Sequence, residues 1–574
     1  ISDLSTHIIL KNADLRLQPL KFGMAGAGIA ADDPNRVKAA VKYVLNTAAA
    51  NGDCYLPKER LIAQAVDLLQ LHPLAIENAI RDLQVNSQLL QEKLNGEDCV
   101  YLNYYFYAEM SVAKRLLELS ADYDAPNMES VATEIARVEK ETGVVLAEEQ
   151  RAAVAEALSC GVLIITGGPG TGKTTTINTI LRILKKEDMD VVLAAPTGRA
   201  AKRMTEATGM EAQTIHRLLG ISFIGEDSRR QTFDKNEEDP IEADVIIIDE
   251  SSMVDIVLMQ ALLRAVESGS RIIFVGDVDQ LPSVGAGNVL KDMIRSERLK
   301  VVRLQHVFRQ AQESAIIMNA HRINQGEEPV LNEEGTDFFF MRRAYADEVA
   351  GTIRELVTKR LPKFTGCDGL QDMQILTPMR KGTLGVQNLN QVLQQTLNPA
   401  APDKREVQFR QITFREGDKV MQIKNNYNTV WRMFNSLGKR EDEGLGVYNG
   451  DAGVILSIDS YAEQLRVAFD DGKVVDYDFS QLEELELAYA ITIHKSQGSE
   501  YPVVILPVYS GPPMLMTRNL LYTAVTRAKQ LVVLVGLRET VSAMICNDRE
   551  IDRYTGLAQR IRNLYDFMHG GDIV

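Results

Sequence analysis

Two parallel-sheet lobes of the α/β class are predicted by the alternation of strands and helices along this chain. Apolar runs of strand length, such as residues 162–165 and 245–248, are separated by segments with helical periodicity. Because each helix carries the chain back to the same end of the sheet, this alternation produces parallel strands. A second series surrounds residues 373–377, 501–506 and 531–535, so we expect a second lobe.

The composition is that of an ordinary globular protein. The 574 residues are 45% hydrophobic and 25% charged, enough for several packed domains. The sequence has no apolar run of about 18 residues and no signal-peptide pattern, so we expect a cytoplasmic protein without a membrane partner. Five widely spaced cysteines argue against a disulfide framework and a zinc site and favour buried, reduced thiols. Because the first residue is Ile1, we expect further domains upstream.

The net charge of −16 argues against a uniformly basic, nucleic-acid-binding surface. Residues 373–432 nevertheless carry nine basic side chains against four acidic ones. This excess allows a local basic groove on an acidic protein. A solvated, loop-rich surface explains the same excess equally well.

A phosphate-binding loop follows the strand at residues 162–165. Residues 167–174 read GGPGTGKT and open a segment of helical character. The glycines let backbone N–H groups converge on phosphates, Lys173 can reach the β- and γ-phosphate oxygens, and the Thr174 hydroxyl can bind Mg²⁺. We therefore expect a nucleoside triphosphate site here, in preference to a glycine-rich turn without a ligand.

Two further strands end in polar residues. The strand at residues 245–248 runs into Asp249, which can hold Mg²⁺, and Glu250, which can orient or deprotonate an attacking water. The next strand runs into residues 276–282, where Gln280 can contact a γ-phosphate or its water. Ligands of parallel sheets gather at the carboxyl ends of the strands, so these residues belong beside the phosphate loop. Taken singly, either segment could be a simple turn.

Seven segments in order resemble the motifs of superfamily one helicases, and most closely those of the RecD-like branch. These segments are residues 167–174, 195–200, 249–253, 276–282, 308–310, 494–500 and 522–529. The resemblance extends from about Leu146 to the C-terminus. It implies two RecA-like lobes, hydrolysis of ATP with Mg²⁺ in the cleft between them, and an ATP-dependent DNA helicase that moves 5′ to 3′ on single-stranded DNA in repair, recombination or replication.

The resemblance also implies roles for individual residues. It makes Arg309 and Arg527 arginine fingers, which would close the cleft around a γ-phosphate and release it after hydrolysis. The implied catalytic residues are Lys173, Asp249, Glu250, Gln280, Arg309 and Arg527, and the implied Mg²⁺ ligands are Thr174 and Asp249. The implied nucleotide-binding residues are Gln150, which would read adenine, and Gly168, Pro169, Gly170, Thr171, Gly172, Lys173, Thr174, Thr175, Gln280, Arg309, Gly498, Glu500 and Arg527.

The same resemblance implies a set of DNA contacts drawn from both lobes. They are Pro196, Thr197, Arg199, Thr214, His216, Thr377, Arg380, Asn425, Asn449, Thr492, His494, Lys495 and Gln497. Hydroxyl, amide and imidazole groups mixed with a few cations suit contacts to phosphate and sugar that must be released at every step.

The expected domains follow from these patterns. Residues 1–145 contain three helical segments and a hairpin, which suggests a mostly helical, winged-helix-like domain with either a DNA- or partner-binding role or a structural one. The first RecA-like lobe is expected at 146–330, with a β-hairpin insertion at 221–240 that resembles a strand-separating pin and could equally be a solvated hairpin. The second lobe is expected at 331–406 and 486–574, with a small β-barrel inserted at 407–485.

Three other functions fit part of this pattern. They are the helicase module of a conjugative relaxase, a subunit of a RecBCD-type complex, and a nucleotide-gated clamp that grips nucleic acid without unwinding it. A relaxase would need an upstream tyrosine nuclease with a histidine cluster, which this chain lacks. RNA could replace DNA, because phosphate and stacking contacts tolerate either sugar. We expect a monomer that binds single-stranded DNA and junctions of single- and double-stranded DNA, with a single-strand-binding protein as a candidate partner.

Overall fold

Two parallel sheets confirm the predicted α/β architecture. The computed structural model describes residues 32–121, 128–223, 231–333, 335–435, 438–548 and 552–570. In the first lobe the strand order is β11-β4-β10-β9-β5-β6. The strands are β4 (Val162–Gly167), β5 (Val191–Ala195), β6 (Ala212–Thr214), β9 (Val245–Ile248), β10 (Arg271–Gly276) and β11 (Lys300–Leu304).

Helices cover both faces of the first sheet, which explains why its central strands are apolar throughout. Ile246 and Ile248 of β9 join a core with α12 and α13, whereas Val245 and Ile247 join a core with α8 and α9. A strand buried on both faces is expected to be continuously hydrophobic. The helices of this lobe are α8 (Glu148–Ser159), α9 (Lys173–Lys186), α10 (Gly198–Thr208), α11 (Ile215–Leu218), α12 (Ile256–Arg264), α13 (Val289–Arg295) and α14 (Arg309–Gln312).

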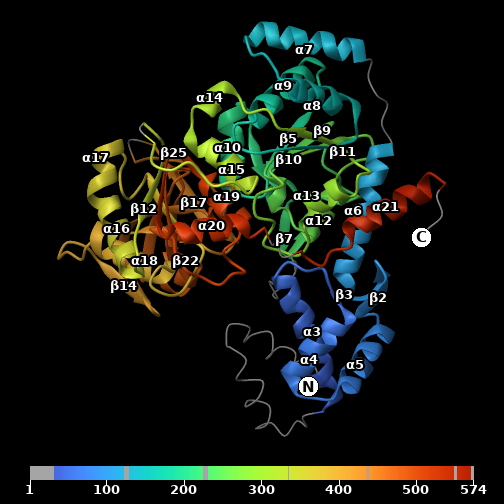
Figure 1. The fold of residues 1–574 in the computed structure, drawn as a ribbon, viewed down its shortest axis with the longest axis horizontal. Coiled ribbons are helices and arrows are strands. Elements are labelled where there is room, and N and C mark those ends of the chain that lie inside the picture. The colour runs from blue at the N-terminus through green and yellow to red at the C-terminus, as the bar shows by residue number, and fades with distance from the viewer. Residues whose placement is uncertain are drawn as a thin grey trace.

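The second lobe, yellow to red in Figure 1, is a five-stranded parallel sheet with the order β12-β25-β24-β13-β23. Its strands are β12 (Phe338–Arg342), β13 (Met373–Thr377), β23 (Ala490–Thr492), β24 (Tyr501–Val508) and β25 (Ala528–Gly536). Its helices are α15 (Ala315–Asn324), α16 (Ala346–Glu355), α17 (Leu361–Thr365), α18 (Val386–Leu397), α19 (Arg518–Val525) and α20 (Arg538–Cys546). Helix α15 was expected in the first lobe, but its apolar side chains join the core of the second lobe with α19 and β25.

The insertion in the second lobe is all-β. A hairpin of β14 (Glu406–Phe409) and β15 (Ile412–Arg415) precedes a seven-stranded antiparallel sheet with the order β18-β17-β21-β20-β19-β16-β22. The strands of that sheet are β16 (Lys419–Gln422), β17 (Asn426–Phe434), β18 (Arg440–Val447), β19 (Ala452–Asp459), β20 (Gln464–Phe469), β21 (Val474–Asp478) and β22 (Leu485–Leu487). Its core is continuous with one face of the parallel sheet, so the insertion is packed firmly on the lobe.

The N-terminal domain contains the expected three helices and hairpin. The helices are α3 (Pro34–Ala50), α4 (Lys58–Leu69) and α5 (Pro73–Val85), and the strands are β1 (Tyr55–Pro57), β2 (Leu89–Leu94) and β3 (Glu97–Leu102). Asp33 caps α3, because its carboxylate accepts hydrogen bonds from the N–H groups of Asn35 and Arg36. Apolar faces of the three helices and the strands form a separate core.

Three further helices connect the domains differently from our expectation. Helix α6 (Asn103–Ala121) packs on α12, and α7 (Met128–Thr142) packs on α8 and α9 of the first lobe. Helix α21 (Leu557–Met568) was expected in the second lobe, but it packs on α6 and α13, as the red and blue helices of Figure 1 show. Arg560 of α21 donates to the buried carboxylate of Glu109 at 3.2 Å, so an ion pair holds this return of the chain.

The hairpin insertion of the first lobe is present at its base. Strands β7 (Ile221–Phe223) and β8 (Gln231–Phe233) pair in antiparallel fashion, with Ile221 opposite Phe233. Residues 224–230 lie outside the described residues. In the described part of the chain, we find no helix with the length and apolar character that crossing a membrane requires. All five cysteines are free; Cys54 and Cys99 are buried as expected, whereas Cys546 is exposed.

Candidate active site between the two lobes

The phosphate-binding loop lies between β4 and α9, as predicted. Gly170 and Gly172 have φ angles of +73° and +79°, a left-handed conformation that favours glycine. The ammonium of Lys173 donates to the carbonyl oxygens of Gly167 at 2.5 Å and Gly168 at 3.0 Å, so it lies over the loop. Thr174 is exposed in the first turn of α9.

Asp249 and Glu250 follow β9 at the same end of the sheet. Glu250 has a φ of +50°, which is strained for a residue with a side chain and is typical of functional sites. Burial, with the Glu250 carboxylate as the second cause, raises the pKa of Asp249. Burial also acts to raise the pKa of Glu250, but Arg203, Arg527 and Lys173 outweigh it, so this pKa is lowered.

The donor set fits Mg²⁺. The carboxylates of the partly buried Asp249 and the buried Glu250 repel each other, and a divalent cation relieves that repulsion. Thr174 and Asp249 supply the hard oxygen ligands that Mg²⁺ prefers. Among the described residues, no group of three or more His, Cys, Asp or Glu side chains could hold a metal ion alone.

The segment after β10 joins the lobes. The buried Asp277 carboxylate accepts hydrogen bonds from Gln280 Nε2 at 3.1 Å and from the Tyr522 hydroxyl of α19 at 2.7 Å. The backbone N–H of Leu281 donates to Thr523 Oγ1 at 3.0 Å. The predicted γ-phosphate residue Gln280 therefore lies in a network that includes the second lobe.

The second lobe also contacts the phosphate loop directly. A ring nitrogen of His321, on α15, lies 3.0 Å from the carbonyl oxygen of Pro169. Helix α15 packs on α19 and β25 of the second lobe. The N–H of Phe308 donates to Gly170 O at 3.3 Å, which places the start of α14 beside the loop. The side chain of Arg309, one of the two predicted arginine fingers, lies outside the described residues.

Arg527, the other predicted finger, is buried near the acidic pair. Its guanidinium donates to the carbonyl oxygens of Thr523 and Ser499 and to Thr526 Oγ1 at 3.2 to 3.4 Å. Its charge helps to lower the pKa of Glu250, so it lies within electrostatic reach of that carboxylate.

Gln150 lies next to the phosphate loop in a role that the sequence did not indicate. Its amide nitrogen donates to Gly172 O at 3.1 Å, and its amide oxygen accepts from the N–H of Ala147 at 3.0 Å. The side chain is 1% exposed. In this structure it therefore supports the loop and the start of α8.

The first group of predicted DNA contacts lies at the start of α10, opposite the second lobe. Arg199 donates to Ser499 Oγ and the Tyr501 hydroxyl, both at 3.1 Å, and pairs with Asp470 of the insertion at 2.9 Å. Pro196 and Thr197 precede the helix, and Thr197 caps it. Gly498, predicted beside the nucleotide, lies against Thr197: a Cβ at Gly498 would come within 2.7 Å of Thr197 Oγ1.

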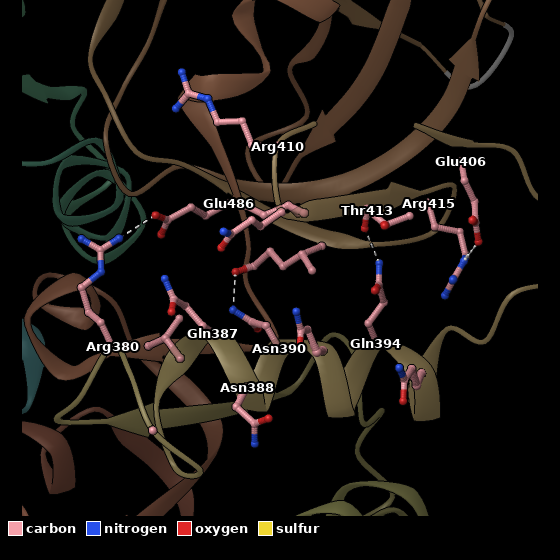
Figure 2. A pocket seen from close by; sticks show the side chains of 17 residues that line it. Arg380, Gln387, Asn388, Asn390, Gln394, Glu406, Arg410, Thr413, Arg415 and Glu486 are labelled. Atoms are coloured by element: carbon pink, nitrogen blue, oxygen red, sulfur yellow. Dashed lines mark hydrogen bonds and ion pairs between the residues drawn. The ribbon is translucent and has the colours of Figure 1, made fainter. Parts of the chain in front are cut away.

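A second group lies on the second lobe and the insertion. Arg380 and Lys495 both pair with Glu486, at 2.6 Å and 2.7 Å. Figure 2 shows Arg380 reaching Glu486 at one end of a polar cavity of about 890 Å³ between α18 and the β14–β15 hairpin. On the insertion, the side-chain oxygen of Asn425 accepts from the N–H of Asn449 at 2.8 Å, which brings these two predicted contacts together.

Two predicted DNA contacts are buried away from this surface. The Thr377 hydroxyl is fully buried and donates to Leu384 O at 2.7 Å, so it shapes the loop that carries Arg380. Gln497 is also buried, and its amide donates to Leu281 O at 2.7 Å. Gln497 therefore joins the lobes through this buried hydrogen bond.

The remaining predicted contacts are partly used by the backbone. The hydroxyls of Thr214 and Thr492 accept from the N–H groups of Arg217 and Lys495, so both threonines cap short helical turns. The His216 ring lies 6.2 Å from the ring of Phe233, at the base of the hairpin insertion. His494 is exposed on the turn that follows Thr492.

Ion pairs offset part of the excess of cations in residues 373–432. Four of the nine cations pair with carboxylates that come from later in the chain. The pairs are Arg380 with Glu486, Arg410 and Lys424 with Glu483, and Arg432 with Asp476. Arg415 pairs with Glu406 within the segment. The local charge of the sequence is therefore partly neutralised in three dimensions.

Sequence reasoning assigned no role to Arg203, Glu486 or Asp470. Arg203 pairs with Glu250 at 2.6 Å and with Glu500 at 2.7 Å, so Glu500 contacts α10 and not a nucleotide. The repeat of arginine at positions 199 and 203, one helical turn apart, was the only available sequence signal for Arg203.

The phosphate loop, the acidic pair and the contacts across the cleft define a P-loop nucleoside triphosphatase of the two-lobed helicase class. Residues 145–338 match the family described as AAA domain. Residues 389–469 match the ATP-dependent RecD-like DNA helicase SH3 domain, and residues 487–535 match the UvrD-like helicase C-terminal domain.

Individual proteins give the same result. The chain is 34% identical to the ATP-dependent RecD2 DNA helicase of Deinococcus radiodurans over 93% of its own length and 70% of that protein. It is 32% identical to the RecBCD enzyme subunit RecD of Mycolicibacterium smegmatis, covering 72% and 75% of the two chains. A structure of Bacteroides Pif1 bound to ssDNA covers 68% of this chain and 92% of its own, at 20% identity and a TM-score of 0.41. The chain belongs to the RecD-like family of ATP-dependent DNA helicases.

Proposed function

We propose that this chain couples ATP hydrolysis in the interlobe cleft to 5′-to-3′ movement along single-stranded DNA and to separation of the duplex ahead. The observation that carries the proposal is that both lobes contact the same phosphate loop and the segment after β10. The contacts are His321 with Pro169 and Tyr522 with Asp277. A change in the ligand at the loop therefore acts on both lobes at once.

Hydrolysis needs four functions in the cleft, and the chain offers a residue for each. The loop N–H groups and Lys173 would bind the phosphates. Thr174 and Asp249 would hold Mg²⁺, which supplies charge neutralisation on the phosphate oxygens when bound. Glu250 would orient the attacking water, and Arg527 would stabilise the charge that develops on the γ-phosphate.

Movement follows if the γ-phosphate strengthens the contact between the lobes. Arginines that reach this phosphate from the second lobe favour a closed cleft with ATP and lose that contact with ADP. Arg527 is the proposed arginine of the second lobe, and Arg309, on α14 just before the second lobe begins, is proposed to act with it. The proposed DNA contacts lie on both lobes, so opening and closing the cleft changes the distance between two sites of grip.

The proposed DNA track carries few free cations. Arg199 pairs with Asp470, and Arg380 and Lys495 pair with Glu486. Phosphate groups of the strand would exchange with these carboxylates, so each contact is weaker than one made by an unpaired cation. Weak contacts to the backbone suit a motor that must release the strand at every step.

Duplex separation is proposed for the hairpin insertion. Strands β7 and β8 project from the first lobe, and Phe233 lies beside His216, a proposed DNA contact. A hairpin next to the strand would enter between paired bases as the protein advances. The winged-helix-like N-terminal domain is proposed to bind duplex DNA or a partner protein. We propose that the chain acts as a monomer on junctions of single- and double-stranded DNA.

A strand-displacement assay tests the proposal. Duplexes with a 5′ or a 3′ single-stranded tail are incubated with the protein, with and without ATP. We expect displacement only from the 5′-tailed duplex and only with ATP, and none with Lys173→Ala. Displacement from the 3′-tailed duplex would refute the polarity, and DNA-stimulated hydrolysis without displacement would favour a clamp. RNA tails in parallel measure sugar preference.

A further inference from the structure

Arg203 connects the proposed catalytic carboxylate to an acidic residue of the opposite lobe. One arm of its guanidinium donates to Glu250 Oε1 at 2.6 Å, and the other donates to Glu500 Oε1 at 2.7 Å. The Arg203 side chain is 29% exposed and that of Glu250 is 8% exposed. Glu500 is shared with Lys529, which lies 3.2 Å from it. The two arms are separate donors, so either carboxylate can be released while the other is kept.

Helix α10 places Arg203 one turn after Arg199, on the same face. Arg199 is a proposed DNA contact, and it holds Asp470, Ser499 and Tyr501 across the cleft. The helix is therefore attached to the second lobe at its start by Arg199 and in its middle by Arg203. A helix of this length moves as a unit, so a displacement of its first turn also displaces Arg203 relative to Glu250.

We propose that Arg203 is a positioning residue that restrains Glu250 until DNA engages the start of α10. In the DNA-free protein, Arg203 donates a hydrogen bond to one carboxylate oxygen of Glu250 and so holds the Glu250 side chain toward α10. When a DNA phosphate takes Arg199 from Asp470, α10 shifts, and Arg203 keeps Glu500 and releases Glu250. The freed carboxylate can then orient the attacking water. The inference depends on the proposed function, in which Glu250 orients this water and Arg199 contacts DNA.

The restraint explains why Glu500 follows the turn that carries the proposed DNA contacts of the second lobe. A guanidinium released from Glu250 would otherwise be a partly buried charge without a partner, which is costly. Glu500 accepts that charge throughout the change. Substituting Glu500 should therefore strengthen the hold of Arg203 on Glu250, which is the opposite effect from substituting Arg203.

The test measures ATP hydrolysis with and without saturating oligothymidylate for the wild type, Arg203→Gln, Arg203→Lys and Glu500→Gln. Losing one charge-assisted hydrogen bond to Glu250 should raise the DNA-free kcat of Arg203→Gln roughly tenfold and lower its stimulation by DNA by a similar factor. KM for ATP should stay unchanged, and Arg203→Lys should restore most of the stimulation. Glu500→Gln should lower the DNA-stimulated kcat and should not raise the DNA-free rate.

Arg137 provides a matched control, because it also bridges two glutamates, Glu134 and Glu141, but lies on α7 away from the cleft. Arg137→Gln should leave both rates at the wild-type values. The inference is overturned if Arg203→Gln leaves the stimulation ratio unchanged, whether both rates fall together or neither changes.

Failure of the proposed function gives a different pattern. It appears in the wild type as hydrolysis without DNA stimulation, or in Lys173→Ala as retained hydrolysis, and the first of these results overturns the inference as well. Binding of a fluorescent ATP analogue reports that each variant is folded. If Arg203→Gln fails to bind it, then Arg203→Lys and Glu500→Gln decide the question: the stimulation ratio should stay near the wild-type value in Arg203→Lys and fall in Glu500→Gln, and a wild-type ratio in Glu500→Gln overturns the inference.

Discussion

Neutralising Glu486 should tighten the binding of single-stranded DNA. Glu486 pairs with Arg380 at 2.6 Å and with Lys495 at 2.7 Å, and both cations are proposed phosphate contacts. A phosphate that binds either cation must first displace this carboxylate. In Glu486→Gln the cations keep their charge and lose their competitor, so the cost of displacement disappears.

The structure gives the magnitude. The Arg380 side chain is 61% exposed, whereas those of Lys495 and Glu486 are 24% and 23% exposed. Exposed ion pairs contribute about 0.2–1 kcal/mol each, and partly buried pairs lie at the upper end. The two pairs together therefore cost the strand about 1–2 kcal/mol, which corresponds to a roughly 5- to 30-fold tighter Kd in Glu486→Gln.

The assay is fluorescence anisotropy of a labelled oligothymidylate, without nucleotide, at about 50 and 200 mM salt. In the wild type, the displaced Glu486 takes up a cation from solution and offsets part of the counterion release from DNA. The variant lacks this uptake. The slope of log K against log salt should therefore be steeper in Glu486→Gln by up to about 0.7, the value for one phosphate contact on a single strand.

Glu483→Gln is the control for this prediction. Glu483 also holds two cations, Arg410 at 3.1 Å and Lys424 at 2.9 Å, and neither is a proposed DNA contact. Glu483→Gln removes the same charge as Glu486→Gln at a position three residues away, so it should change the Kd for single-stranded DNA less than twofold. Equal tightening by both variants would mean that net charge alone controls the affinity, and the assignment of Arg380 and Lys495 to the DNA track would be refuted.

Three further predictions concern the lobe contact, the hairpin and a buried carboxyl group. Tyr522→Phe removes a 2.7 Å hydrogen bond to Asp277, which is worth about 1.5–3 kcal/mol for a charged acceptor. In a steady-state ATPase assay, this variant should have a DNA-stimulated kcat at least roughly tenfold lower. An unchanged kcat would contradict the coupling between the lobes. Deleting residues 221–240 should abolish strand displacement and spare hydrolysis on single strands, and equal loss of both would argue against a pin. Burial raises the pKa of Asp292 from its usual 3.8 to about 7, so its folded form holds a proton that the unfolded chain releases, and this contribution to stability is lost as pH rises from about 4 to 7. In urea titrations, the stability of Asp292→Asn relative to the wild type should rise by about 2–3 kcal/mol between pH 5 and pH 8, and a pH-independent difference would contradict the raised pKa.

The residues at the ends of strands were predictable because their positions follow from chain order. Lys173, Asp249 and Gln280 each come directly after an apolar strand or its loop, and parallel strands bring such residues to one edge. The phosphate loop and the acidic pair therefore lie where the sequence placed them. Positions along one strand or turn are local properties, and local properties can be read from sequence.

Partners across the cleft were not predictable in the same way. Gln497 belongs to a motif that resembles a DNA-binding one, yet its amide bonds to Leu281 of the other lobe. The cations of residues 373–432 allowed a basic groove or a solvated surface, and four of the nine have counterions that lie 44 to 106 residues later in the chain. Helix α21 shows an amphipathic pattern that predicts a buried face, but not which surface buries it.

The pairing of cations with acids gives physical meaning to the acidic character of this helicase. A net charge of −16 would oppose binding of a polyanion, and the proposed track adds little positive charge because Asp470 and Glu486 neutralise its cations. The affinity for DNA then depends on replacing a carboxylate by a DNA phosphate at each of these cations. Because one anion replaces another, the exchange costs little free energy in either direction. Arg199 belongs to the first lobe, whereas Asp470, the carboxylate that a phosphate would replace, belongs to the insertion on the second lobe. If Arg199 contacts DNA as proposed, binding of the strand would break a contact between the lobes at the place where it makes its own, so DNA would act on the same interlobe arrangement that ATP is proposed to control from the phosphate loop.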